Sequence, residues 1–365
     1  MPDRRLERWQ KVRDRLGANR LDGLMVLNRA SVTYLTGFTG SAGVFLLSAS
    51  DGAILVTDGR YKEQAGLQTK GLPLKMHIER DYVRAVGNCL TGLGWKRIGF
   101  EDRHCTVAFY QGVKDRLGTK RVRFVGASDL MTEIRSLKDE EELQALKKSA
   151  EIVDKALEKT LSEVRAGITE KELAWELESH LRALGSEGVA FAPIVLFGER
   201  TSLPHGQPSD RALKKGDWLL LDCGAVWHGY ASDITRTFFF GRPQSEDRHI
   251  YKAVWEAQQA GLAALREGVI GQFVDRTVRK VLRSYGLEKF FLHGTGHGVG
   301  LEIHEAPGLN KTAHQKLRSG MVVTVEPGVY IGGSGGVRIE DMAVVTEDGC
   351  RLLTQSPNPP QLPVL

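Results

Sequence analysis

Residues 165–185 read RAGITEKELAWELESHLRALG, and residues 266–286 read REGVIGQFVDRTVRKVLRSYG. The two segments match at a constant offset of 101 positions, so that Gly167 stands opposite Gly268 near the start of each. Apolar residues recur at matching positions with helical spacing, which predicts the buried stripe of an amphipathic helix in each segment. The matched apolar residues are Leu173, Leu177 and Leu181 in the first segment, and Val274, Val278 and Leu282 in the second.

The repeat continues beyond these helices at an offset of 104 positions. KKGDWLLLDCG matches RSGMVVTVEPG, which places Asp222 opposite Glu326. A second acid follows each of them beyond a glycine-containing turn, Asp233 after 11 residues and Glu340 after 14. The pattern of each half therefore predicts a helix, a strand ending at a carboxylate, a hairpin turn and a second strand with another carboxylate. Two halves related by a pseudo-twofold axis would bring the four acids together on a shared curved sheet, in an α+β domain.

His297, in the segment HGTGHGVG, joins the four acids as a fifth candidate metal ligand. Four carboxylates and one imidazole carry too much negative charge for one divalent ion, and carboxylates this close would repel one another unless cations lay between them. Two hard or borderline divalent ions, bridged by some of the carboxylates, satisfy this requirement. The alternative, ordinary surface acids and a core histidine, requires five apolar or glycine-flanked settings to coincide.

Length and composition predict a two-domain cytoplasmic protein. A chain of 365 residues exceeds a usual single core, and a net charge of +5 that is spread along the chain argues against a nucleic-acid binder. No apolar run approaches membrane-spanning length, and the opening MPDRRLERWQ predicts a charged amphipathic helix instead of a secretory signal. Scattered cysteines without a CxxC pair predict reduced thiols. They are Cys89, Cys105, Cys223 and Cys350.

Residues 1–132 alternate predicted helices and strands, so we expect an α/β domain here. The first helix is expected to bury one face, and segments rich in β-branched and aromatic residues are expected to be strands. The expected helix face comprises Leu6, Trp9, Val12 and Leu16, and the expected strands are GLMVLN, VFLLS, AILVTD, IGFE and RVRFV. The intervening TGFTGSAG fits neither dinucleotide-binding nor P-loop spacing, and we interpret it as a structural turn.

The second domain, residues 133–365, begins with helices whose first residues are marked by capping signals. Asp139 and Glu142 have the spacing of a capping box before one long helix, and Thr169 and Glu172 have it before the next. The proline-rich ending SPNPPQLPVL predicts an extended surface segment.

Four segments of the second domain carry a resemblance to a known family: DCGAVWHGYASDITRTF, HGTGHGVGLEIHEAPG, VTVEPGVYI and GVRIEDMAVVT. They resemble the proline-specific peptidases of the M24 pita-bread metallopeptidase family, namely Xaa-Pro aminopeptidase (aminopeptidase P) and Xaa-Pro dipeptidase (prolidase). The resemblance covers about residues 135–355 and extends more loosely into the first domain through NRASVTYLTGFTGSAG. It implies a pita-bread catalytic domain preceded by an α/β domain of the creatinase/prolidase N-terminal type.

The resemblance also implies a dinuclear metal site. The metal ions would be two divalent ions per chain, with Mn²⁺ expected first and Co²⁺ or Zn²⁺ as alternatives. Asp233 and Glu340 would bridge the two ions, Asp222 would bind one of them, and His297 and Glu326 would bind the other. Water bridging two such ions loses a proton easily, which would supply a hydroxide nucleophile.

Further residues receive roles from the same resemblance. Glu326 would accept and relay the proton of the nucleophile, and His304 would help to hold the tetrahedral intermediate. His205 and His293 would line the pocket for proline, while structural roles in their loops are the alternative. We interpret Arg338 as the partner that fixes the bridging carboxylate two residues later. The expected substrates are short proline-containing peptides, and enzymes that resemble this chain are commonly homodimers.

The choice between the two activities depends on one position. Some relatives restricted to dipeptides place an arginine after His-x-x-Pro to hold the free carboxylate of the substrate, whereas HEAPG puts Gly308 there. This favours an Xaa-Pro aminopeptidase, with Xaa-Pro dipeptidase as the alternative. A methionine aminopeptidase would not need the first domain, and creatinase-like hydrolases or a non-catalytic pita-bread binding protein would lack the metal ligands.

Overall fold

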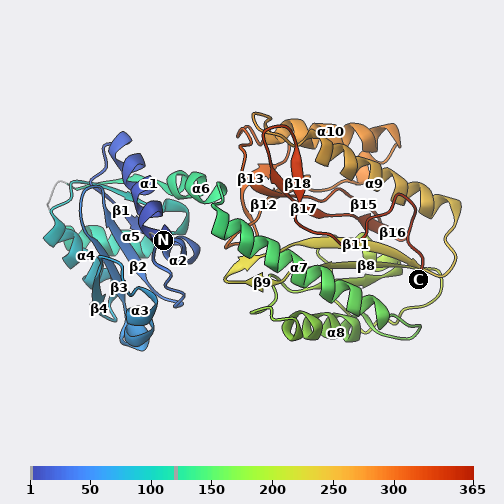
Figure 1. Cartoon of the computed structure of the whole chain (residues 1–365), viewed down its shortest axis with the longest axis horizontal. Helices are drawn as coiled ribbons and strands as arrows, with labels where there is room; N and C mark the ends of the chain where they lie inside the picture. Colours follow the sequence, from blue (N-terminus) through green and yellow to red (C-terminus); the bar gives the residue numbers. More distant parts are fainter. Residues whose placement is uncertain (1–2, 119–121) are drawn as a thin grey trace. The chain divides into compact units, whose positions relative to one another are not determined.

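The computed structural model describes residues 3–118 and 122–365, which form two compact units, Met1–Arg135 and Ser136–Leu365 (Figure 1). Residues 1 and 2 and residue 121, the first of the expected strand RVRFV, lie outside these ranges. None of the helices in the described part of the chain is long and apolar enough to cross a membrane.

The first unit is built on a six-stranded sheet with the order β4-β3-β2-β1-β5-β6. The strands are β1 (Gly23–Val26), β2 (Val44–Ser48), β3 (Ala53–Thr57), β4 (Lys75–Ile78), β5 (Arg97–Phe100) and β6 (Arg123–Gly126). The helices are α1 (Arg4–Ala18), α2 (Arg29–Thr36), α3 (Lys62–Gln68), α4 (Tyr82–Leu93), α5 (Val107–Leu117) and α6 (Ser128–Ser136). The expected α/β architecture is therefore confirmed. The sequence did not predict β4, an edge strand whose side chains are largely exposed and show no apolar alternation.

The expected buried face of α1 is correct at three positions and wrong at the fourth. Trp9, Val12 and Leu16 are buried, whereas Leu6 is 39% exposed. Arg8 is buried instead, because its guanidinium lies 4.2 Å from the centre of the Tyr34 ring and donates a 3.0 Å hydrogen bond to the Tyr34 carbonyl. Residues two apart lie on different sides of a helix, so the buried face of α1 is turned towards Arg8 and away from Leu6.

The second unit holds two sheets and two helix pairs. The sheets have the orders β11-β8-β7 and β13-β12-β14-β17-β18, and two short hairpins, β10-β9 and β15-β16, lie beside them. The helices are α7 (Glu140–Ser162), α8 (Glu170–Ala183), α9 (Ser245–Ala264) and α10 (Gly271–Ser284). The strands are β7 (Ile194–Phe197), β8 (Asp217–Cys223), β9 (Val226–Trp227), β10 (Tyr230–Ala231), β11 (Ile234–Phe240), β12 (Gly296–Gly298), β13 (Glu305–Leu309), β14 (Val322–Val325), β15 (Gly328–Ile331), β16 (Gly335–Arg338), β17 (Asp341–Val345) and β18 (Cys350–Leu352).

Helices cover both faces of the strands that carry the acids (Figure 1). Leu219, Leu221 and Cys223 of β8 pack into the core shared with α7 and α8. Trp218, on the opposite face of β8, packs into the core shared with α9 and α10. Successive side chains of a strand alternate in direction, so β8 directs Asp222 away from the α8 side.

The two halves of this unit repeat the same backbone contacts, which confirms the internal duplication. An isolated bridge joins Thr169 to Ala212 in the first half, and its counterpart joins Ile270 to Lys316 in the second. The N–H of Gly167 donates to the carbonyl of Leu213, as that of Gly268 does to Leu317, each over 2.9 Å. These pairs follow the two offsets found in the sequence. The fold thus places β8 of one half and β14 of the other as equivalent strands, each leading to an acid.

The capping boxes predicted for the first helix pair are both present. The side chains of Asp139 and Glu142 cap α7 reciprocally, and those of Thr169 and Glu172 cap α8 in the same way. Each box satisfies backbone N–H groups that would otherwise lack partners at a helix start. Local sequence therefore fixes where α8 begins, which matters below because its first residue is buried.

Gly224, directly after β8, allows a close approach that no larger residue permits. A Cβ atom at this position would overlap the backbone carbonyl of Ser232. We expect Gly224→Ala to destabilise the second unit by about 1–3 kcal/mol, the usual cost of overpacking. Gly188→Ala is the control, because a Cβ there meets open space. Calorimetric unfolding should show a lower transition temperature for the first variant alone, and equal temperatures for both would contradict the packing argument.

Candidate metal centre

One cavity of about 680 Å³ in the second unit collects the candidate residues from both halves of the repeat. All nine residues singled out in the sequence line it: His205, Asp222, Asp233, His293, His297, His304, Glu326, Arg338 and Glu340. They come from strands and from the loops between elements, so the duplicated fold brings distant segments to one place. Cys223 is not among the lining residues, because it packs into the core on the opposite face of β8.

Three of these residues form a compact group of ligand atoms. One ligand atom from each of Asp233, His297 and Glu340 lies within 4.8 Å of the other two. Nε2 of His297 is 3.6 Å from an oxygen of Asp233 and 3.4 Å from Oε1 of Glu326. Nδ1 of His297 donates to the carbonyl of Gly298 over 3.0 Å, which leaves Nε2 as the nitrogen that faces the carboxylates. This is the orientation that a metal-binding histidine requires.

The glycines around His297 explain how its backbone reaches this position. A Cβ on Gly296 would overlap the carbonyl of Thr324, and a Cβ on Gly298 would overlap the carbonyl of Ala306. β12 is therefore held between β14 and β13 at a separation that only glycine allows. The motif GHG thus serves to bring one imidazole to the acids of both halves.

Burial and mutual repulsion oppose ionisation of the four acids. Burial, together with the charges of neighbouring carboxylates, raises the pKa of Asp233 and of Glu340 well above its usual value. Burial also raises the pKa of Asp222, and it raises the pKa of Glu326 to about 8. The same desolvation lowers the pKa of His297 to about 4, so this imidazole is neutral at pH 7. A neutral imidazole among buried acids is ready to bind a cation.

Two oxygen atoms at the centre of the cavity support the presence of cations. Oδ1 of Asp222 and Oε1 of Glu340 are buried and accept no hydrogen bond from any residue that the structure describes. Buried carboxylate oxygens without a partner are costly unless a positive charge is placed against them. Oxygen ligands with one imidazole suit hard or borderline divalent ions. The residues present therefore fit divalent metal ions.

Arg338 has a different partner from the one that the sequence predicted. Its guanidinium forms an ion pair with Asp222 and not with Glu340. It also donates to Thr235 Oγ1 over 3.1 Å and to the carbonyl of Pro204 over 3.2 Å. Thr235 in turn donates to Oε2 of Glu340 over 2.7 Å, so Arg338 reaches that acid only through the threonine. The long side chain of Arg338 extends from β16 across to β8, and adjacency in the sequence did not reveal this.

Tyr330 is a member of the site that the sequence analysis missed. Arg338 donates to its hydroxyl over 2.8 Å, and the hydroxyl lies 2.8 Å from Nε2 of His293. Because Nδ1 of His293 faces the carbonyl of Gly294 at 2.8 Å, the tyrosine donates to Nε2. Both nitrogens of His293 are therefore occupied. No local sequence pattern points to Tyr330, because its ring reaches the site by folding back over Gly328, where a Cβ would overlap it.

The remaining histidines lie at the edges of the same cavity. The ring of His304 is 4.3 Å from that of His297 in an edge-to-face arrangement, so His304 is directly beside a candidate ligand. His205 lies on the loop between the short 3₁₀ helix η3 (Gly198–Ser202) and β8.

Two threonines support site residues. The backbone of His297 is fixed by Thr324, whose hydroxyl accepts from the N–H of His297 over 3.1 Å. Thr324 and Thr235 were also missed, because threonine in a strand carries no functional signal by itself.

Comparison with known proteins extends over the whole chain. Residues 144–347 match metallopeptidase family M24, and residues 8–137 match the creatinase/prolidase N-terminal domain. An Xaa-Pro dipeptidase of Pyrococcus furiosus is 33% identical over 96% of this chain and 98% of its own. The solved structure of an Xaa-Pro dipeptidase from Bacillus anthracis has a TM-score of 0.93 and 39% identity, covering 99% of this chain and all of that one. An X-Pro aminopeptidase structure from Thermotoga maritima has a TM-score of 0.90 and 34% identity, covering 98% of this chain and 99% of that one.

Relief of repulsion among the acids gives a testable consequence. We expect Asp233→Asn to stabilise the metal-free protein at pH 8, because ionised Asp233 is penalised by burial and each unit of raised pKa costs about 1.4 kcal/mol. The same change should remove most of the stabilisation that added Mn²⁺ gives to the original protein. Thermal unfolding with chelator and then with Mn²⁺ measures both effects. Glu347→Gln, on the exposed surface, is the control. Unreduced stabilisation by Mn²⁺ in Asp233→Asn would refute the assignment.

Proposed function

Because this chain belongs to metallopeptidase family M24, we propose that it hydrolyses the peptide bond before proline and releases the N-terminal residue, as an Xaa-Pro aminopeptidase does. The alternative is an Xaa-Pro dipeptidase, the name carried by other relatives. The observation that carries the proposal is the single cavity in which four acids and His297 lie beside three further histidines. A non-catalytic binding protein would not need this complete set of ligands.

The proposed cofactor is a pair of divalent ions, with Mn²⁺ expected first and Co²⁺ or Zn²⁺ as alternatives. By the resemblance to the family, Asp233 and Glu340 would each serve both ions, and their ligand atoms form one compact group with that of His297. Asp222 would hold one ion, and His297 and Glu326 would hold the other. Such ions, when bound, acidify a water molecule and polarise a carbonyl group. Asp222 is kept in place for this purpose by its ion pair with Arg338.

Glu326 is proposed to move the proton of the attacking water. Its carboxylate lies between two histidines. Oε1 is 3.4 Å from Nε2 of His297, and Oε2 is 3.9 Å from Nδ1 of His293. Burial raises the pKa of this carboxyl group to about 8, and positive charge placed beside it would favour the ionised form that accepts a proton.

The histidines are proposed to orient the substrate. His304, beside His297, would hydrogen-bond the scissile region, and His205 would lie along the side of the cavity that holds proline. His293 is fixed by Tyr330 and by the Gly294 carbonyl, and its pKa is lowered to about 4, chiefly by burial. It therefore shapes the pocket as a neutral imidazole and is not positively charged at pH 7.

Proline also suits this cavity for physical reasons. Its amide nitrogen has no hydrogen to donate, and its ring fixes φ, so peptidases that bind an extended backbone do not accept it well. The cavity wall includes an apolar segment, residues 191–194, next to the loop of His205. A rigid apolar wall can select the ring without requiring an N–H group.

Gly308 supports cleavage of peptides longer than a dipeptide. A Cβ at this position would lie 2.9 Å from the side-chain amide nitrogen of Asn310, which lines the cavity. The place from which an arginine could reach a substrate carboxylate therefore holds no cation. A charge-assisted hydrogen bond contributes about 1.5–3 kcal/mol, which corresponds to roughly tenfold or more in affinity.

We therefore expect Ala-Pro-Ala to be cleaved at least as well as Ala-Pro, and Ala-Ala-Ala to be left essentially intact. Gly308→Arg should shift the preference towards Ala-Pro by roughly tenfold, because the Asn310 amide is the end of a side chain that can move aside. Values of kcat/KM for the three peptides test both statements. Strong preference of the unmodified protein for Ala-Pro would instead identify a dipeptidase.

Assembly and location are part of the same proposal. We propose a homodimer, on the analogy with related enzymes, that acts on short proline-containing peptides and has neither nucleic acid nor membrane as a partner. The four free cysteines agree with a cytoplasmic location, where thiols stay reduced. Light scattering should give twice the chain mass of 40.3 kDa. A monomer that keeps full peptidase activity would contradict the dimer.

A further inference from the structure

Glu170, the first residue of α8, is a fully buried carboxylate outside the metal centre. It accepts hydrogen bonds from Phe197, the last residue of β7, and from Arg200 and Ser209 of the segment that follows. None of these contacts is needed to form α8, because its start is already capped by Thr169 and Glu172. The placement of a charged group at zero exposure therefore calls for a reason beyond the helix.

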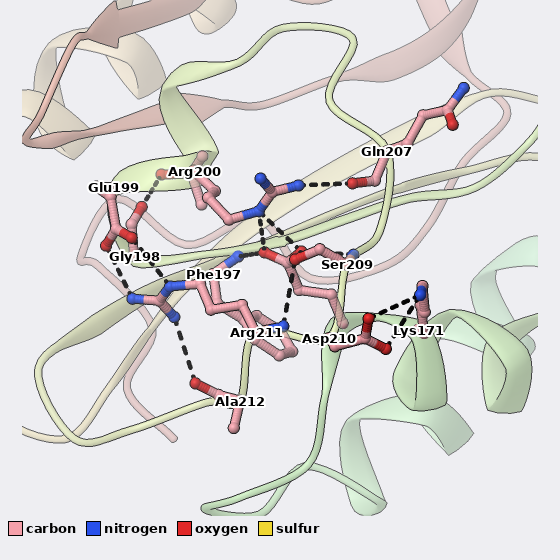
Figure 2. Close-up of polar contacts among 12 residues, drawn as sticks. Lys171, Phe197, Gly198, Glu199, Arg200, Gln207, Ser209, Asp210, Arg211 and Ala212 are labelled. Atoms are coloured by element: carbon pink, nitrogen blue, oxygen red, sulfur yellow. Dashed lines mark hydrogen bonds and ion pairs between the residues drawn. The ribbon is translucent and has the colours of Figure 1, made fainter.

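The contacts of Glu170 close the segment 197–209 at both of its ends. Oε1 accepts from the N–H of Phe197 over 2.8 Å, and Oε2 accepts from the N–H and the hydroxyl of Ser209 over 2.8 and 2.6 Å. Nε of Arg200 lies 2.9 Å from Oε2. Arg200 in turn donates to the carbonyl of Gln207 over 2.7 Å, which adds a second link across the loop (Figure 2). Both ends of the segment are thus tied to a single carboxylate.

The part of the segment between these ties reaches the metal centre. His205 and its neighbours Pro204 and Gly206 line the cavity. The carbonyl of Pro204 accepts from Arg338, the residue that holds Asp222. A change in the position of this loop would therefore move His205 and would remove one of the contacts that orient Arg338.

The second half of the repeat shows how the equivalent helix start packs when it has no such carboxylate. The duplication places Gly271 opposite Glu170, and the two N–H groups donate to equivalent carbonyls, those of Gln315 and Arg211 respectively. A Cβ on Gly271 would overlap the carbonyl of Gly308, so there β13 packs directly on the helix start. In the first half the loop also contacts the helix start, since the N–H of Lys171 donates to the carbonyl of Ser209 over 3.1 Å. Position 170 there carries a side chain, and its carboxylate is the acceptor for the buried N–H groups of Phe197 and Ser209.

We propose that Glu170 is a positioning residue for the peptidase site: it holds the loop that carries His205 at the wall of the cavity. The inference rests on the proposed function for its effect on catalysis. The hydrogen bonds by which Glu170 holds segment 197–209 do not depend on that activity. Glu170 touches neither substrate nor metal in this arrangement, and it acts through His205 and Pro204.

The direct test uses Glu170→Gln, which keeps the size of the side chain but turns one acceptor into a donor. Either orientation of the amide sets an N–H group against the N–H of Phe197 or of Ser209. We expect kcat/KM for Ala-Pro-Ala to fall on the order of 10- to 100-fold, the scale of a misplaced catalytic loop. Metal content should stay unchanged, because all five proposed ligands lie outside the segment. Lys171→Gln is the matched control: it removes an exposed ion pair to Asp210 on the same loop and should change little.

A double-mutant cycle with His205→Ala separates positioning from general destabilisation. If Glu170 acts through His205, Glu170→Gln should cost much less in the His205→Ala background than in the original protein. Equal fold-losses in both backgrounds, or no loss of kcat/KM at all, would overturn the proposal. Ser209→Ala is a milder variant for the same cycle should Glu170→Gln fold poorly.

Hydrogen exchange tests whether Glu170 holds segment 197–209, and it requires no measurement of peptidase activity. Backbone amides of segment 197–209 should exchange faster in Glu170→Gln than in Lys171→Gln, while α8 keeps its protection. Unchanged exchange in this segment would also overturn the proposal. If the original protein cleaved no Xaa-Pro peptide, the proposed function would fail, and the exchange result would still decide whether Glu170 holds the loop.

Discussion

Mutual repulsion among four close carboxylates, three of them buried, is the physical constraint on which the second unit depends. Asp233 and Glu340 belong to one compact group with His297, and burial with neighbouring charge raises the pKa of both acids well above usual values. One oxygen of Asp222 and one of Glu340 lack any partner among the described residues. A fold that holds acids in this way is stable in ionised form only with compensating positive charge. Divalent cations supply it, and the same cations make the site chemically useful.

The duplicated architecture explains how the acids reach one another. Equivalent strands β8 and β14 lead to Asp222 and Glu326, and equivalent backbone bridges at Thr169 and Ile270 fix the helix starts. The two halves nevertheless differ where they border the cavity. One half packs β13 directly against Gly271, whereas the other ties its loop to the buried carboxylate of Glu170. Symmetry thus places the ligands, and departures from symmetry shape the walls.

Much of this arrangement could be predicted from the sequence because local patterns encode it. Matching apolar stripes and glycines revealed the repeat, and the capping boxes at Asp139 and Thr169 marked the helix starts. Long-range polar contacts could not be predicted in the same way. The partner of Arg338 is 116 residues away from it in the sequence, and the contacts of Tyr330 depend on a ring folded over Gly328. Leu6 and β4 were misjudged or missed since exposure there follows from tertiary packing and not from periodicity.

Reconstitution of chelator-treated protein with Mn²⁺ tests most directly whether the acids exist to bind catalytic cations. Metal content and hydrolysis of Ala-Pro-Ala should be measured on the same samples as Mn²⁺ is added back. The arrangement of Asp222, Asp233, His297, Glu326 and Glu340 predicts no activity without metal, and activity that rises with occupancy up to two ions per chain. Full activity in a sample that holds no metal would contradict this conclusion.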